Sequence, residues 1–160
     1  VAKIAVQAST TAEFSERYSG KVRINSAVLS KAASRSNLIA QQTPNTGPMT
    51  FTHTQAADEL SGKFRNLFYV PENGELAEGS RLLLTLGATY DRDGNFSTTD
   101  DQAEVAYPVE LSGDGAGRFL RNGYYRVQAL IDGLTGSELS VSISVADWEA
   151  PVTQSVNLGQ

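Results

Sequence analysis

The sequence predicts an all-β protein whose strands form a two-sheet antiparallel β-sandwich. Three observations lead to this prediction. Apolar and polar residues alternate with a period of two along most of the chain, turn-forming residues separate the alternating stretches, and no long stretch has the period of a helix. With 160 residues, of which 40% are hydrophobic, the chain has the size and apolar content of one domain. We therefore expect residues 1–160 to form a single sandwich.

The first sixty residues contain clear strand patterns only near the N-terminus. Residues 2–7 and 21–25 alternate and are predicted strands, and one helical turn is expected between them at residues 11–18. From residue 26 to residue 60 the alternation weakens, so this stretch is interpreted mainly as loop. Within it, residues 49–53 are a candidate for one further strand.

The same alternation predicts five more strands in the rest of the chain: residues 67–70, 81–90, 104–111, 124–132 and 139–145. Pro108 cannot donate a ladder hydrogen bond, so its strand is expected at a sheet edge or a bulge. Residues 133–136 supply a turn that makes the last two strands antiparallel neighbours. The residues that parity assigns to the core include Ile4, Val6, Leu82, Leu84, Val127, Ile131, Val141, Ile143 and Val145.

The end of the chain contains another extended segment, which Pro151 separates from the preceding strand. The residues on one side of this segment are Val152, Gln154, Val156 and Leu158. A strand of this kind can pair with its own sheet or complete the sheet of another molecule. Residues 151–160 are therefore interpreted as a donor strand or a tail, and the residues alone favour pairing with the chain's own sheet.

The composition excludes several classes of function. Cysteine is absent and His53 is the only histidine, which excludes thiolate chemistry, Cys/His zinc sites and cysteine-ligated iron. The net charge of −5 argues against binding to nucleic acid, which requires a basic patch. No apolar run approaches the ~20 residues of a membrane-spanning helix, so membrane insertion is not expected. We predict no cofactor.

One acidic stretch has some of the features of a calcium-binding loop. Asp91, Asp93 and Asn95 are alternating oxygen ligands around Gly94, as such a loop requires. The twelfth position counted from Asp91 is Gln102, where an EF-hand has a bidentate glutamate. A hairpin turn explains the same residues equally well, so no metal is predicted.

No group of residues predicts an enzyme. His53 could act as a general base, but the sequence has no Gly-x-Ser-x-Gly motif that would supply a serine nucleophile. A histidine in a Thr-rich strand or loop is ordinarily solvated. Glu72 and Glu75 flank a turn and resemble a glycosidase pair, but carboxylates are common in turns. We therefore expect a protein without catalytic activity.

Three aromatic residues have two interpretations each. Tyr69, Tyr124 and Trp148 either form an exposed platform for a sugar or a protein partner, or they pack against the core. For Trp148, burial statistics favour a position that closes one end of the core.

Several short motifs occur in an order that resembles a known family. They are Val1-Ala2-Lys3-Ile4, Ser36-Asn37-Leu38, Phe68-Tyr69-Val70-Pro71-Glu72-Asn73, Tyr107-Pro108-Val109, Arg121-Asn122-Gly123-Tyr124, Ile131-Asp132-Gly133 and Val145-Ala146-Asp147-Trp148. Together they span nearly the whole chain and resemble the second domain of the fimbrillins, the type V pilins and related fimbrial lipoproteins of Bacteroidales.

This resemblance implies a transthyretin-like, Greek-key sandwich and a non-enzymatic role. It implies a structural subunit of an extracellular fimbria, or pilus, at the outer membrane, which supports cell adhesion. The partners would be other fimbrial subunits, joined by strand exchange through residues 151–160. The alternative is an adhesin domain of a fimbrial tip that binds a host glycan or protein. The family also has a first domain and a lipoprotein signal before the region that this chain resembles. Its members serve as stalk, tip or anchor subunits.

Overall fold

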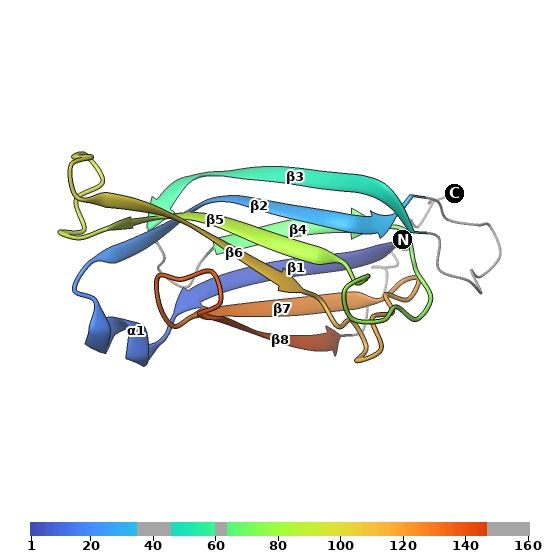
Figure 1. The fold of residues 1–160 in the computed structure, drawn as a ribbon. Coiled ribbons are helices and arrows are strands. Elements are labelled where there is room, and N and C mark those ends of the chain that lie inside the picture. Colours follow the sequence, from blue (N-terminus) through green and yellow to red (C-terminus); the bar gives the residue numbers. More distant parts are fainter. Residues whose placement is uncertain (35–45, 60–63, 147–160) are drawn as a thin grey trace, which may run out of the picture.

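The computed structural model describes residues 1–34, 46–59 and 64–146, and within them the chain forms eight strands and one short helix (Figure 1). The elements are β1 (Ala2–Thr10), α1 (Ala12–Arg17), β2 (Lys21–Ala33), β3 (Thr46–Glu59), β4 (Phe64–Val70), β5 (Leu83–Asp91), β6 (Gln102–Glu110), β7 (Tyr124–Ile131) and β8 (Leu139–Ala146). The prediction of an all-β fold is confirmed.

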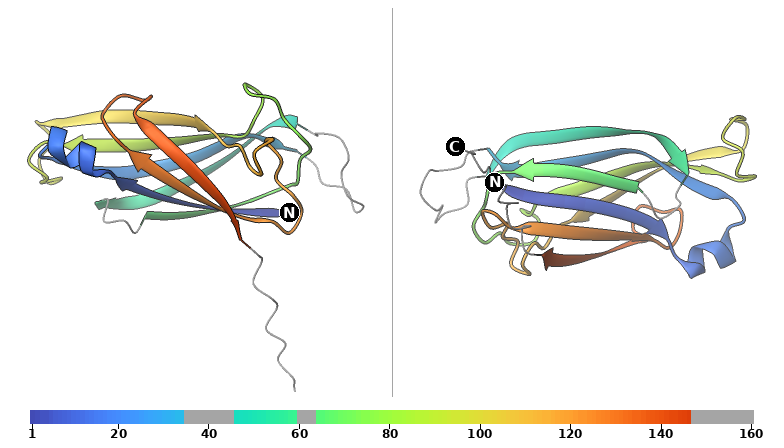
Figure 2. Two further views of the ribbon diagram at one scale, coloured as in Figure 1. Left: turned by 90° about the horizontal axis from the view of Figure 1, so that it is seen from below. Right: turned by 180° about the vertical axis from the view of Figure 1, so that it is seen from behind.

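The strands form two four-stranded sheets that pack face to face (Figure 1 and Figure 2, left). The order in the first sheet is β4-β1-β7-β8, and in the second it is β3-β2-β5-β6. The predicted two-sheet sandwich is therefore confirmed, but its pairing is not purely antiparallel. β1 and β7 run parallel, with Ile4 opposite Tyr125. Parallel neighbours require a long crossover connection, and most of the chain lies between these two strands.

The core lies between the sheets and matches the predicted parity for most strands. The predicted core residues that are fully buried are Ile4, Val6, Leu82, Leu84, Val127 and Ile131. Large aromatic side chains fill the two ends of the core. Phe14 of α1 packs against Tyr18 and Tyr90 at one end, and Phe119 packs against Tyr125 at 4.6 Å between ring centroids.

The helix has little more than one turn because capping residues end it on both sides. Its N-cap is Thr11, whose hydroxyl accepts a hydrogen bond from the Phe14 N–H at 3.3 Å. Tyr18 ends the helix in an extended conformation. The helix anchors the crossover from β1 to β2 by burying Phe14.

The inward row of β8 is less buried than the alternation predicted. Val141 and Ile143 are only partly buried against the core, and Val145 is 59% exposed, so its assignment to the core was wrong. β8 is the outermost strand of its sheet and faces β6, which is outermost in the other sheet. A strand in this position has neighbours on fewer sides, and the described residues leave its C-terminal end uncovered.

The interpretation of residues 26–60 as mainly loop was also wrong, because β2 continues to Ala33 and β3 covers Thr46–Glu59. β2 has a bulge between Ile24 and Ser26, where its register shifts against both neighbouring strands. Val22 and Ile24 face the core before the bulge, whereas Ala27 and Leu29 do so after it. Because the inward-facing positions change from even to odd residue numbers at the bulge, a search for strict alternation does not detect the second half of the strand.

Other local predictions are confirmed. Pro108 lies in β6, an edge strand of the described sheet, where a missing N–H costs no ladder bond. β7 and β8 form the expected antiparallel pair, with Val127 opposite Ile143. The predicted strand at residues 49–53 is part of β3.

Candidate functional site

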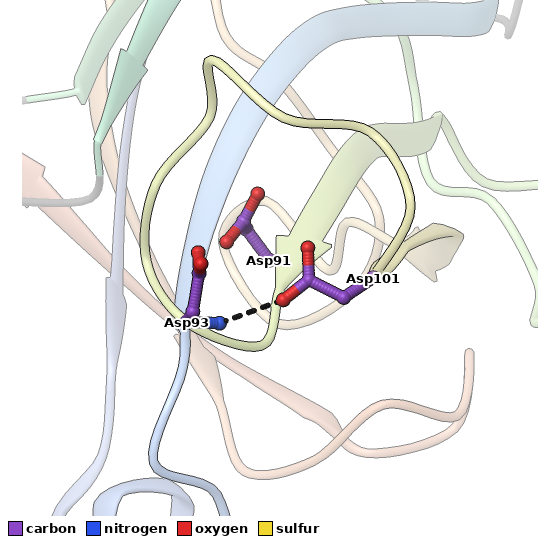
Figure 3. A group of neighbouring side chains, drawn as sticks. All are labelled: Asp91, Asp93 and Asp101. Atoms are coloured by element: carbon purple, nitrogen blue, oxygen red, sulfur yellow. Dashed lines mark hydrogen bonds between the residues drawn. The ribbon is translucent and has the colours of Figure 1, made fainter.

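The acidic loop between β5 and β6 gathers three carboxylates, from Asp91, Asp93 and Asp101 (Figure 3). One oxygen of each lies within 4.8 Å of the other two. Asp91 ends β5 and is fully buried, whereas Asp93 is exposed on the turn. The third member is Asp101, which lies a short way downstream of the Asp91–Asn95 motif in the sequence, and Asn95 takes a different role.

Backbone and amide donors of the same loop already bind these oxygens. The Asn95 N–H donates to Asp91 Oδ1 at 2.9 Å and to Asp93 Oδ1 at 2.7 Å. Gln102 Nε2 donates to Asp91 Oδ2 at 2.9 Å, and the Asp93 N–H donates to Asp101 Oδ2 at 3.0 Å (Figure 3). Asn95 therefore contributes a donor to the group, and its side-chain oxygen accepts from the Ser97 N–H instead.

The two carboxylates at the centre of the loop have opposite pKa shifts. Burial raises the pKa of Asp91, but hydrogen bonds with Gln102 and Asp93 and with the Asn95 and Gly94 N–H groups together lower it by more, so the net shift is downward. The Asn95 N–H lowers the pKa of Asp93, but the neighbouring Asp91 and Asp101 carboxylates together with partial desolvation raise it by more. This is the pattern of a turn that holds a buried anion with its own donors.

Glu72 and Glu75, whose spacing resembles a glycosidase pair, lie in different environments. Glu72 is buried and forms an ion pair with Arg121 at 2.5 Å, while Glu75 is exposed. The Glu72–Arg121 contact joins the segment after β4 to the segment before β7 and has a structural role. His53 lies in β3, opposite Ala27 of β2.

The first sheet has an open outer edge along β8, which among the described strands pairs only with β7. Its inward side chains are partly exposed, and exposure is greatest at Val145. An edge with free backbone groups and a half-covered apolar row is the kind of surface to which another strand can add. The predicted assembly residues Val152, Gln154, Val156 and Leu158 lie outside the described residues.

The outward face of the first sheet carries a shallow groove of about 670 Å³. It lies over β1 and β7, the two central strands of that sheet, which are seen from this side in Figure 2, right. Lys3, Tyr124 and Arg126 line it together with glutamine and serine side chains. The small side chain of Ala5 lies between Leu67 and Arg126 in the register, which leaves the hollow between them.

Two of the three predicted aromatic residues lie at this face. Tyr69 is 52% exposed on β4, and its partner in the register is Lys3. Tyr124 is half-buried because two cations pack on it: Lys3 Nζ lies 4.4 Å and Arg126 Cζ 5.2 Å from its ring centroid. Trp148 lies outside the described residues. The sequence interpretation missed Lys3 and Arg126, although their outward parity was readable.

Comparison with known proteins identifies the fold. No family model and no curated protein sequence matches the chain. Among solved structures, the chain is similar to a "putative cell adhesion protein" from Parabacteroides distasonis, with a TM-score of 0.54 and 14% identity over 96% of this chain. The resemblance to a fimbrillin-like domain is thus confirmed at the level of the fold.

Two further structures have TM-scores below 0.5. The tip fimbrial protein Mfa3 from Porphyromonas gingivalis matches 91% of this chain at 14% identity and a TM-score of 0.49. A fimbrial protein from Bacteroides vulgatus matches 92% at 10% identity and a TM-score of 0.46. The chain spans about half the length of these structures, namely 53%, 50% and 54% of the three. No helix in the described part of the chain is long and apolar enough to cross a membrane.

Proposed function

We propose that the chain is a structural domain of a surface fimbria that supports cell adhesion. The observation that carries this proposal is the sandwich fold shared with the P. distasonis protein over 96% of this chain. The ordered sequence motifs that resemble the second domain of fimbrillins support it independently. The proposed role is mechanical, needs no catalysis, and is exerted outside the cell at the outer membrane. A first domain and a lipoprotein signal in the full-length subunit are part of this proposal.

Assembly with other fimbrial subunits is proposed to occur by β-strand exchange. Residues 151–160 would leave the domain and add to a sheet of a neighbouring subunit. Backbone hydrogen bonds would provide direction, and Val156 and Leu158 would fill apolar positions in the groove. The open β8 edge supports the receiving half of this scheme, since its apolar row already faces an incompletely covered core.

The test is a pair of double variants in the full-length subunit. Val156→Asp with Leu158→Asp places charges where apolar pockets are expected, at a cost of at least ~1–3 kcal/mol each. We expect fibres to be lost while the monomer stays folded, as measured by electron microscopy and circular dichroism. Thr153→Asp with Ser155→Asp is the matched control, because it adds the same charge on the opposite parity.

Two outcomes of this experiment would contradict strand donation. Normal fibres from the Val156→Asp, Leu158→Asp variant would show that the segment carries no assembly contact. An unfolded monomer would show that the strand belongs to its own sheet. The proposed fimbrial role would remain in either case, and only the proposed mechanism of assembly would change.

The second candidate function is an adhesin domain of a fimbrial tip that binds a host glycan or protein. The exposed Tyr69 ring and the adjacent groove favour it. The two functions differ in the surface they use: strand exchange uses a sheet edge and the chain end, whereas an adhesin would use the face of a sheet.

A further inference from the structure

We propose that the outward face of the sheet β4-β1-β7-β8 binds an acidic oligosaccharide, with Lys3 and Arg126 as the anion-binding groups. This inference goes beyond the structural role in a fimbria and does not depend on strand exchange. It develops the adhesin alternative into a site with named residues and a ligand class.

The first argument is charge. The chain has a net charge of −5, yet none of the four strands β1, β4, β7 and β8 contains an aspartate or a glutamate. The other sheet has carboxylates in its strands, among them Glu104 and Glu110 of β6. Lys3 and Arg126 therefore form a local positive patch on an acidic protein, which attracts anions.

The second argument is the way these two cations are held. Lys3 and Arg126 both pack on the ring of Tyr124, and no ion pair among the described residues uses either of them. A cation–π contact orders a charged head without neutralising it. The Arg126 guanidinium thus keeps its fork of donors for a carboxylate or a sulfate, which it can bind through two hydrogen bonds.

The third argument is the chemistry of the groove. Gln128, Ser142 and Ser144 line it with amide and hydroxyl groups that hydrogen-bond to sugar hydroxyls. The volume of about 670 Å³ is in the range of small-ligand sites. The exposed Tyr69 ring, next to Lys3 in the register, supplies an apolar face with a polar tip.

The position of the groove disfavours other anionic ligands. It lies over β1 and β7, whose backbone groups already bond to strands on both sides, so a peptide cannot add there as a strand. The two cations that line the groove, Lys3 and Arg126, are too few for the counterion release that drives nucleic-acid binding. The groove is open and its lining is mixed, with Leu67 as an exposed apolar side chain, so it lacks the deep apolar pocket in which a protein side chain anchors.

The experiment is calorimetric titration of the full chain with three tetrasaccharides. One is carboxylated (hyaluronan), one is sulfated (heparin) and one is neutral (cellotetraose). We expect saturable binding of at least one acidic sugar, and binding of the neutral sugar that is at least ~10-fold weaker. The carboxylated and sulfated arms distinguish which acidic group is recognised.

Two variants test the residues. Lys3→Gln with Arg126→Gln should weaken binding of the acidic sugar by ~10-fold or more, since charged hydrogen bonds are lost. Lys21→Gln with Arg23→Gln on the other sheet makes the same change in net charge and should keep binding. Ser144→Glu should also abolish binding, whereas Ser140→Glu, on the same strand outside the groove, should not.

The proposal is overturned if neither acidic tetrasaccharide binds saturably, or if the Lys21, Arg23 control loses as much affinity as the groove variant. A hexaglutamate peptide that displaces the sugar with equal affinity would overturn the sugar assignment in favour of an acidic protein ligand. These measurements use monomeric protein, so failure of fibre assembly leaves them unaffected.

Discussion

Ile131 and Ile143 occupy neighbouring strands and face the same core, but they are buried to different extents. Ile131 is fully buried in β7, whereas Ile143 in the outermost strand β8 is only partly covered. Next to them, Val145 is 59% exposed. Residues of the same type and parity therefore contribute unequally to the stability of this domain.

We expect Ile131→Ala to lower the free energy of unfolding by about 2–5 kcal/mol, because truncation of a fully buried isoleucine leaves a cavity. Ile143→Ala should cost less, since part of its side chain is already in water. Val145→Ala should change stability by no more than about 0.5 kcal/mol. Urea denaturation measures all three. A loss for Val145→Ala equal to that for Ile131→Ala would show that the end of β8 is covered in solution.

Tyr107 is a buried polar group with a defined partner. Its hydroxyl donates to the Gly133 carbonyl at 2.8 Å and ties β6 to the turn between β7 and β8. Burial, with a smaller contribution from the charge of Glu138, raises the pKa of Tyr107 to about 12. In the unfolded chain the same group ionises near pH 10.

This shift predicts a loss of stability at alkaline pH. Between about pH 10 and 12 the unfolded chain loses the Tyr107 proton while the folded chain keeps it, so ionisation favours unfolding as the pH rises. Tyr107→Phe removes this group, and the slope of stability against pH in that window should become shallower. Urea midpoints measured from pH 8 to pH 12 test this, and parallel curves for the two proteins would refute it.

At the scale of elements, the β5–β6 loop shows how hydrogen bonds within a loop limit its capacity to bind a metal ion. The loop holds Asp91 with donors from Asn95 and Gln102, so part of the oxygen capacity that a cation would use is already taken. Gln102 stands where an EF-hand has its bidentate glutamate and supplies a donor instead of a ligand.

We therefore predict that the melting temperature of the domain is the same in millimolar calcium and in excess EDTA. A calcium ion bound only by the folded state would raise the melting temperature. Asp93→Ala is the companion variant, because it removes an exposed carboxylate of the loop, and it should leave assembly and sugar binding unchanged. A melting temperature that rises with calcium in the wild type but not in Asp93→Ala would establish a calcium site.

At the scale of the whole molecule, strand order separates the surfaces that the two candidate functions need. The outermost position of β8 leaves an edge for strand addition, while the central position of β1 and β7 gives a closed sheet face. The proposed assembly through the edge and the proposed ligand binding on the face therefore use separate surfaces of the molecule. The helix and the acidic loop lie at the end of the sandwich opposite the N-terminus (Figure 1).

Alternation by itself determined the fold class and most of the core of this protein. Parity is a local property, so the buried rows of β1, β5 and β7 were readable from single strands. The sequence motifs also indicated a fimbrillin-like domain. The bulge in β2 hid its second half, because one extra residue reverses which parity faces the core.

Apart from the β6 edge, which Pro108 indicated, tertiary structure alone decided which strands are edges and which residues share a surface. Val145 is exposed because it lies at the end of the outermost strand β8 that the described residues leave uncovered, and strand order is set by packing between distant segments. Lys3 and Arg126 are far apart in the sequence, and the parallel pairing of β1 with β7 brings both onto the Tyr124 ring. The positive patch depends on long-range register, which no local pattern of side chains encodes.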